Sequence, residues 1–147
     1  MFDFSDSLQR GLDAAKKAQE NREEIQSIIN ELNEALRSMS EGKVEIVIVR
    51  RSETSDELGR LIFFLDKKQD ELVLAVRSIA QQGKPARQIA RWKQSDSGYP
   101  CTIMWGDRQV WCDDRASLQT ELGELVSSPV VGEAIVNAMN YQSSEST

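Results

Sequence analysis

Residues 6–39 read DSLQRGLDAAKKAQENREEIQSIINELNEALRSM, and this stretch decides the fold class because it predicts one long helix. It contains no proline, and its single glycine, Gly11, costs a helix only about 1 kcal/mol. Ser5 or Asp6 is suited to cap the first turn, and Gly42 is suited to end the last one. We therefore expect an N-terminal helical segment over residues 1–42.

The predicted helix is amphipathic and carries a seven-residue repeat in which two positions, three residues apart, are mostly apolar. These positions are occupied by Leu8, Ala15, Arg22, Ile29 and Leu36, and by Gly11, Ala18, Ile25, Leu32 and Met39. Eight of the ten are apolar, which is the pattern of a coiled-coil seam. Ile28 and Ala35 widen the stripe in the second half, as expected of a helix that packs on a core.

The length of this helix predicts that it extends beyond its own domain. Thirty-four residues at about 1.5 Å per residue span roughly 50 Å. A compact domain of this chain length has a diameter of roughly 38 Å. We expect residues 25–39 to pack on the sheet and the first half to meet another chain, because an isolated helix is only marginally stable in water.

Self-association through this helix is the first functional hypothesis, and it predicts a homodimer. The residues expected to make the contact are Leu8, Leu12, Ala15, Ala18 and Ile25. Arg22, within the seam, has two interpretations. In the first, Arg22 lies where the helix leaves its core, so that its aliphatic part packs while its guanidinium reaches water. In the second, Arg22 fixes the register of the paired helices and the number of chains.

From residue 43 to residue 112 the apolar period changes to two, which predicts strands. Val44, Ile46 and Ile48 alternate with their neighbours in this way. Short polar turns separate the predicted strands, which cover residues 44–49, 58–65, 72–77, 87–93, 99–105 and 108–112. This spacing indicates an antiparallel meander of five or six strands.

The last two predicted strands form the best-defined local unit, because Gly106-Asp107 fits a two-residue type II′ turn. In that register Cys101 lies opposite Cys112, on the same side as Ile103. Three interpretations follow for the cysteines: two small core residues, a cross-strand disulfide that a reducing compartment would disfavour, or a redox or metal role.

Two helices are predicted after the sheet. Asp113-Asp114 can cap a helix over residues 116–126, although the same pair could bind a cation, and Ser128-Pro129 can begin a second one. Residues 142–147 are polar and predict a disordered tail. The prediction is a single α+β domain over residues 1–141, with a long N-terminal helix (1–42), an antiparallel sheet (43–112) and two C-terminal helices (113–141).

Composition predicts a cytoplasmic protein of bacterial or phage type without a membrane segment. No stretch approaches the roughly 18 apolar residues of a membrane helix, the N-terminus is acidic rather than basic, and the chain has only two cysteines. The net charge of −6 divides into −4 over residues 1–42, +3 over 43–112 and −5 over 113–147. This division predicts pairing within or between chains, or two surfaces for two partners.

The chain has no histidine, which removes Ser–His–Asp and Cys–His catalysis and histidine-based zinc sites. It also lacks phosphate-binding glycine motifs and calcium-loop spacing. We therefore expect no catalytic residues, no cofactor and no metal. Carboxylate chemistry stays open, since Glu41-Gly42-Lys43 matches half of a nuclease-type metal site. A charge pair at a helix end is the favoured explanation, because these residues precede every strand that could supply the partner aspartate.

A group of cations near aromatic residues supports a second hypothesis. The cations are Lys84, Arg87, Arg91, Lys93 and Arg108, and the rings are Trp92, Tyr99, Trp105 and Trp111. A sheet that exposes both can bind single-stranded nucleic acid. Strand alternation places Arg87, Arg91 and Lys93 opposite Trp92, however, so the alternative is that the ring lies under the helices while the cations face water.

These patterns favour a non-catalytic protein–protein interaction protein, such as an adaptor, a secretion-type chaperone, an immunity protein or an inhibitor. It would act by burying surface on its first helix and its sheet. The alternative is a nucleic-acid-associated regulator that uses the basic and aromatic side of the sheet.

Overall fold

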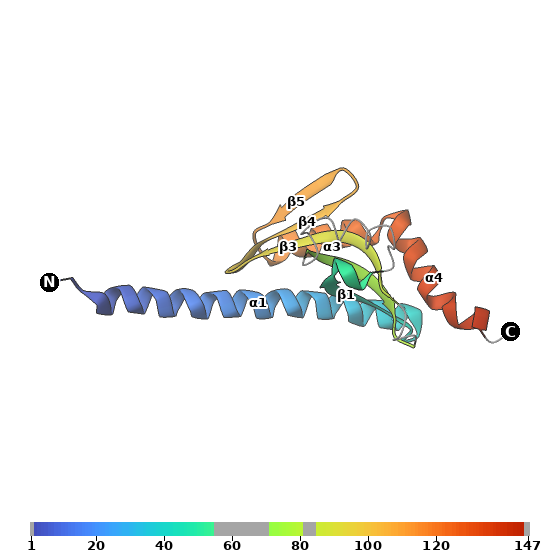
Figure 1. Ribbon diagram of the computed structural model, residues 1–147, viewed down its shortest axis with the longest axis horizontal. Helices are drawn as coiled ribbons and strands as arrows, with labels where there is room; N and C mark the ends of the chain where they lie inside the picture. The colour runs from blue at the N-terminus through green and yellow to red at the C-terminus, as the bar shows by residue number, and fades with distance from the viewer. Residues whose placement is uncertain (1, 55–70, 81–84, 146–147) are drawn as a thin grey trace.

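The computed structural model describes residues 2–54, 71–80 and 85–145, and it confirms the predicted α+β arrangement (Figure 1). A long N-terminal helix precedes a five-stranded antiparallel sheet, and two helices follow it. The elements are α1 (Phe4–Ser40), β1 (Val44–Arg50), the short 3-10 helix η1 (Arg51–Glu53), β2 (Leu72–Ser78), β3 (Arg87–Ser95), β4 (Gly98–Trp105), β5 (Arg108–Cys112), α3 (Arg115–Val126) and α4 (Pro129–Glu145).

The sheet is a simple meander, with strand order β1-β2-β3-β4-β5 and antiparallel pairing throughout. The described strands begin and end within two residues of the predicted ones. The further strand predicted over residues 58–65 lies outside the described residues.

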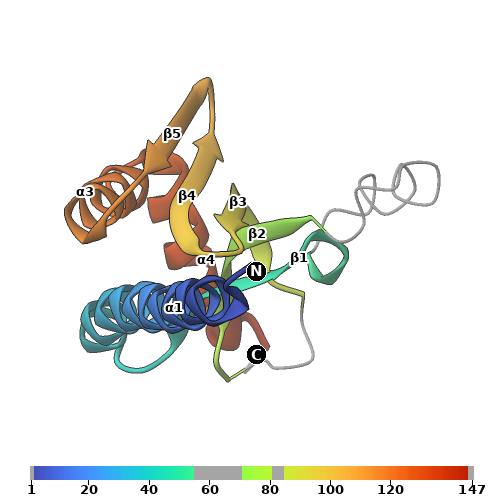
Figure 2. The ribbon, with the colours of Figure 1, turned by 90° about the vertical axis from the view of Figure 1, so that its left-hand side faces the viewer.

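The three α-helices of the described residues, α1, α3 and α4, pack on one face of the sheet (Figures 1 and 2). Alternate strand residues point into a single core, where they meet apolar side chains of α1, α3 and α4; Trp92, at 1% exposure, is its largest fully buried side chain. We call the side away from the helices, over β3, β4 and β5, the open face of the sheet. On β2, Val73 and Ala75 are buried on that side as well.

Asn33 joins α1 to the edge of the sheet. Its side-chain amide donates to the carbonyl of Ile46 at 2.8 Å, and its carbonyl oxygen accepts from the Ile46 N–H, also at 2.8 Å. Both residues are buried. The side chain therefore satisfies the outward backbone groups of β1 as another strand would.

A β-bulge at Ile89 reverses the side-chain alternation within β3. Leu74 pairs with Ala90 and Ala75 pairs with Gln88, so Ile89 is an extra residue. Arg87 pairs with Val76, a core residue, and so belongs to the helix-covered side of the sheet. The prediction that Arg87 shares a face with Arg91 and Lys93 is wrong, because unbroken alternation cannot reveal a bulge.

The β4–β5 hairpin has the predicted register. Trp105 pairs with Arg108, and the ladder ends with Cys101 opposite Cys112. Gly106 has φ +57°, and among the described residues the only non-glycine with positive φ is Glu41. Asp107 therefore has the negative φ that a type II′ turn requires at its second position.

The start of α1 and the end of α4 differ from the prediction. Asp3 caps α1, because its carboxylate accepts from the Ser5 N–H at 3.0 Å, and the helix therefore begins at Phe4. At the other end α4 continues to Glu145, into residues 142–145 that were predicted to be a disordered tail. These residues contain no proline or glycine that would stop a helix.

We predict that Asn33→Leu lowers the free energy of unfolding by about 2–4 kcal/mol, because it leaves two buried backbone groups of Ile46 without partners. Urea denaturation followed by circular dichroism measures the change. Asn30→Leu is the matched control on the exposed side of α1, with an expected change within about 0.5 kcal/mol. Equal effects of the two substitutions would contradict the role assigned to Asn33.

Candidate interaction surfaces

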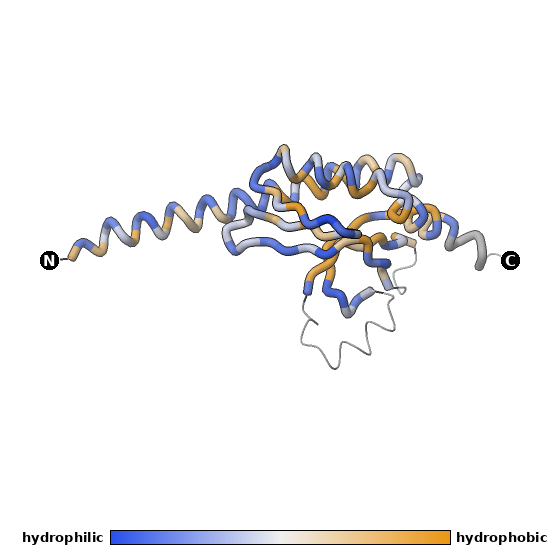
Figure 3. Tube along the Cα trace, turned by 90° about the horizontal axis from the view of Figure 1, so that it is seen from above, coloured by the Kyte–Doolittle hydropathy of each residue, from blue (hydrophilic) through white to orange (hydrophobic). Residues whose placement is uncertain are grey.

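The first candidate surface is residues 4–20 of α1, which we call the free half. It projects beyond the sheet and the other helices (Figures 1 and 3). Phe4, Leu8 and Leu12 are 68%, 67% and 65% exposed. Exposed large apolar side chains in series on a helix are typical of a surface that binds another protein.

Charged and apolar residues occupy opposite sides of the free half. In the seven-residue repeat, Leu8 and Ala15 share one seam position, and Gly11 and Ala18 share the other. Phe4 extends the second position by one repeat, which the sequence did not indicate because the helix was expected to begin after it. The charged residues all lie away from the two seam positions and their flanks: Asp6, Arg10, Asp13, Lys16, Lys17 and Glu20.

The free half ends where the β3–β4 turn rests on α1. Asn21 donates its side-chain amide to the Ser97 carbonyl at 2.9 Å, and the Arg22 guanidinium donates to the Asp96 carbonyl at 2.8 Å. Gly98 lies so close that a Cβ there would be 2.6 Å from the Cβ of Asn21. Arg22 thus lies where the helix leaves its core, and its guanidinium bonds to the turn. A role in setting the register and the number of chains stays a prediction.

Ile25 does not belong to the exposed surface. It was predicted as a self-association residue, but its side chain is 3% exposed and lies in the core of its own chain. The reason is that the domain covers α1 from this position onward. At the far end of the helix the prediction of packing fails for Met39, which is 81% exposed.

The second candidate surface is the open face of the sheet. Lys93, Thr102 and Trp111 form one cross-strand row, and Arg91, Met104 and Gln109 form the next. Trp92 lies in the core on the other side, whereas Trp111 is 67% exposed. An aromatic ring and a cation therefore share the open face, although the ring is not one that alternation within β3 could identify.

Ion pairs engage two of the predicted cations, Arg91 on this face and Arg108 on the helix-covered side of the hairpin. Glu71 receives the Arg91 guanidinium at 2.7 Å and lies 3.6 Å from that of Arg51. Glu121, buried beneath the hairpin, accepts from Arg108 at 2.9 Å and from the Trp105 indole N–H, also at 2.9 Å. Two of the predicted nucleic-acid residues, Arg91 and Arg108, thus have acidic partners.

The remaining predicted cations are dispersed. Arg87 and Lys93 are exposed but belong to opposite sides of the sheet, because of the bulge between them. Lys84 lies outside the described residues. The structure therefore does not bring the five predicted cations together into one patch.

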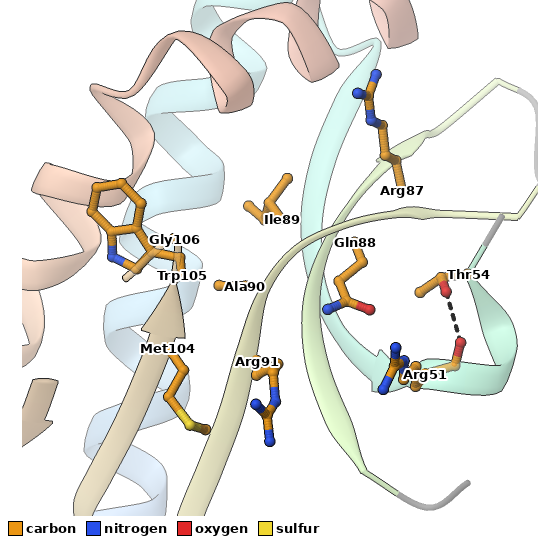
Figure 4. A pocket seen from close by; sticks show the side chains of 10 residues that line it. All are labelled: Arg51, Thr54, Arg87, Gln88, Ile89, Ala90, Arg91, Met104, Trp105 and Gly106. Carbon is orange, nitrogen blue, oxygen red and sulfur yellow. Dashed lines mark hydrogen bonds between the residues drawn. The ribbon is translucent and has the colours of Figure 1, made fainter. Parts of the chain in front are cut away.

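A hollow of about 470 Å³ lies where β3 diverges from β4 (Figure 4). Gln88, Arg91 and Met104 line it along the strands, with Arg51 and Thr54 on one side and Trp105 on the other. Arg87 lines the hollow as well, although its side chain points away from that of Arg91, as the bulge requires. The Nε of Arg51 is buried and finds no hydrogen-bond partner among the described residues.

Cys101 and Cys112 are buried free thiols on the core side of the hairpin, as the first of their three interpretations predicts. Burial raises the pKa of Cys101 to about 12, with a further contribution from Cys112. Burial also raises the pKa of Cys112 to about 11, and Glu121, Asp113 and Asp114 act in the same direction. Neither thiol has the thiolate character that redox or metal chemistry needs near neutral pH.

Other chemical sites are not evident in the described part of the chain. Within residues 2–54, 71–80 and 85–145, no three histidine, cysteine or acidic side chains come together to hold a metal ion. Asp114 acts as the helix cap of α3, since its carboxylate accepts from the Ser117 N–H. None of the described helices is both long and apolar enough to span a bilayer.

Comparison with protein-family models, with curated proteins and with solved structures found no match.

We predict that stability falls as the pH rises above about 9. Burial raises the pKa of both thiols above the ordinary value of 9.0, and burial and the hydrogen bond to Glu24 raise that of Tyr99. The unfolded chain then loses these protons first, so the stabilisation is complete below pH 9 and is lost toward the folded pKa values. Urea denaturation at about pH 8 and about pH 10.5 measures the loss.

The control is the double substitution Cys101→Ala with Cys112→Ala, measured at the same two pH values. We expect lower stability at the lower pH, because two buried side chains become smaller, and a smaller further loss at the higher pH. An unchanged pH dependence in this variant would contradict the assignment to the thiols.

Proposed function

We propose that this chain is a non-catalytic interaction protein that associates with a second copy of itself through the free half of α1. The observation that carries the proposal is the continuous uncharged side of this segment, with Phe4, Leu8 and Leu12 in the solvent. The adjoining part of the same helix is buried by its own domain. A helix whose second half packs in the core of its own domain, while its first half exposes an apolar stripe, is expected of a protein that associates with another chain.

The energy available from such contact supports the proposal. Complete burial of a leucine or phenylalanine side chain contributes about 1.5–3 kcal/mol. Phe4, Leu8 and Leu12 are each about two-thirds exposed, so pairing of two copies would remove six such side chains from water. The charged residues of the free half would stay hydrated because they lie on the opposite side, which avoids the cost of burying ions.

We predict that Leu8→Glu and Leu12→Glu, alone and more strongly together, convert the protein to a monomer. A buried glutamate replaces an apolar contact in both copies, so association weakens roughly a hundredfold or more for the double variant. Size exclusion with light scattering over a tenfold concentration range measures the mass. The wild type should approach twice 16.6 kDa and the double variant should stay at 16.6 kDa.

Gln9→Glu is the matched control, because it adds the same charge one residue away on the charged side of the free half. Its mass should equal that of the wild type, and the circular dichroism of all variants should show an intact domain. A wild type that remains at 16.6 kDa at the highest concentration would refute the proposal.

A nucleic-acid-associated regulator is the second candidate function, and Trp111 is the observation that favours it. Its exposed ring lies in one cross-strand row with Lys93, so a base could stack while its phosphate meets the ammonium group. The acidic net charge of −6 and the ion pairs of Arg91 and Arg108 reduce the attraction for a polyanion. For this reason the proposal above is preferred.

This second function predicts a mobility shift at low salt with a single-stranded probe, and a binding about tenfold weaker for Trp111→Ala. Lys93→Glu should weaken binding as well, whereas Lys17→Glu, with the same charge change on the free half, should weaken it less. The absence of a shift with single- and double-stranded probes at tens of micromolar protein would dismiss this function.

A further inference from the structure

In the seven-residue repeat the apolar stripe of the free half continues the stripe that the domain buries, with a drift of about 20° per repeat along a straight helix. Leu8 and Ala15 hold the repeat position that Ile29 and Leu36 hold further along, and the latter two are buried in the core. Ile25, also buried, continues the other seam position. A helix that lies on the stripe and runs along α1 would therefore meet the β3–β4 turn, which rests on α1 at the ends of these two strands (Figure 1).

This turn closes the stripe at its C-terminal end. The hydrogen bonds of Asn21 and Arg22 to the turn carbonyls, and the close approach of Gly98, leave no space for another helix beyond residue 20. The open length is that of residues 4–20, about 25 Å at 1.5 Å per residue. A second copy offers a segment of the same length and the same limit.

The turn excludes a parallel pair of helices. In a parallel pair, residue 21 of one copy lies beside residue 21 of the other, and each copy brings its own turn and sheet to that point. Both turns would then compete for the space between the helices. In an antiparallel pair each free half ends at its N-terminus before it reaches the turn of the other copy.

The volumes of the seam residues also favour antiparallel pairing. In an antiparallel pair, each residue of one seam position faces a residue of the other seam position on the partner helix. The numbers of two facing residues then have a constant sum, and the seam of residues 4–22 allows two such registers, with sums of 19 and 26. A sum of 19 places Phe4 opposite Ala15 and Leu8 opposite Gly11, a large side chain against a small one in every case. This match keeps the two helix axes at a constant separation, whereas parallel pairing sets Phe4 on Phe4 and Gly11 on Gly11.

The turn decides between the two antiparallel registers. A sum of 26 places Phe4 of one copy opposite Arg22 of the other, where the Arg22 guanidinium already bonds to the Asp96 carbonyl. A sum of 19 places Phe4 opposite Ala15 of the other copy, six residues before Asn21 and seven before Arg22. The contacts of these two residues with the turn are then undisturbed. No charged residue occupies a flanking position of the seam between Phe4 and Asn21, so charge pairs do not oppose this choice.

From these constraints we infer that a second copy of the chain lies antiparallel on the free half of α1, with Phe4 of each copy opposite Ala15 of the other. This inference rests on the proposed self-association and specifies its geometry. The two domains lie at opposite ends of the paired helices, and their open faces stay available to other partners.

Disulfide cross-linking tests this arrangement with Phe4→Cys and Ala15→Cys, prepared with tags of different size. Both positions are exposed, and the native cysteines are buried, so the wild type under the same oxidation is the background. A disulfide needs Cα atoms within about 7 Å. Oxidation of the mixture should give the mixed dimer, while each variant alone should not, since like residues lie about 16 Å apart along the axis.

Other outcomes overturn the inference in distinguishable ways. Cross-linking of Phe4→Cys to itself would show a parallel pair. Cross-linking of Gly11→Cys to Ala15→Cys without the Phe4–Ala15 product would show the other antiparallel register. A wild-type mass of twice 16.6 kDa with no cross-link at any of these positions would place the dimer contact elsewhere, whereas a 16.6 kDa monomer would refute the proposed self-association itself.

Discussion

Polar contacts at two points fix the position of α1 along the sheet. Asn33 bonds to both backbone groups of Ile46 on the edge strand, and Asn21 and Arg22 bond to the carbonyls of the β3–β4 turn. The two points are separated by twelve residues, or about 18 Å of helix. A shift of α1 by a single turn would break both sets of bonds, so the length of helix that remains outside the domain is fixed as well.

The contact of Asn33 with Ile46 also determines which edge strand keeps unpaired backbone groups. Asn33 occupies the outward backbone groups of β1 at Ile46, so this edge offers less to an additional strand. The edge at β5 lies instead in the hairpin that carries Arg108 and Trp111, and Glu121 secures that hairpin to α3. Because Glu121 is buried, removal of Arg108 would take a charged partner from a carboxylate that water reaches poorly.

Local rules were enough to predict the described α-helices and strands to within a few residues, and one hairpin register in full. Residues 6–39 have helical periodicity without a breaker, and Gly106-Asp107 allows only a short turn, which in turn sets Cys101 opposite Cys112. The partners of Asn33 and Arg22 could not be predicted, since they depend on which strand edge and which turn come to rest on the helix. The bulge at Ile89 has no local signal either, and it alone misplaced Arg87.

The composition of the free half is difficult to explain by solubility alone. A helix that only had to stand in water would keep its charges all around and would have no reason for a glycine at position 11, which costs about 1 kcal/mol relative to alanine. Alanine at positions 14, 15 and 18 maintains helix propensity, and its short side chain lets another helix approach closely. Small residues toward one end of a stripe and large ones toward the other complement each other when the stripe meets its own reversed copy. The same sequence would leave gaps against a copy running in the same direction.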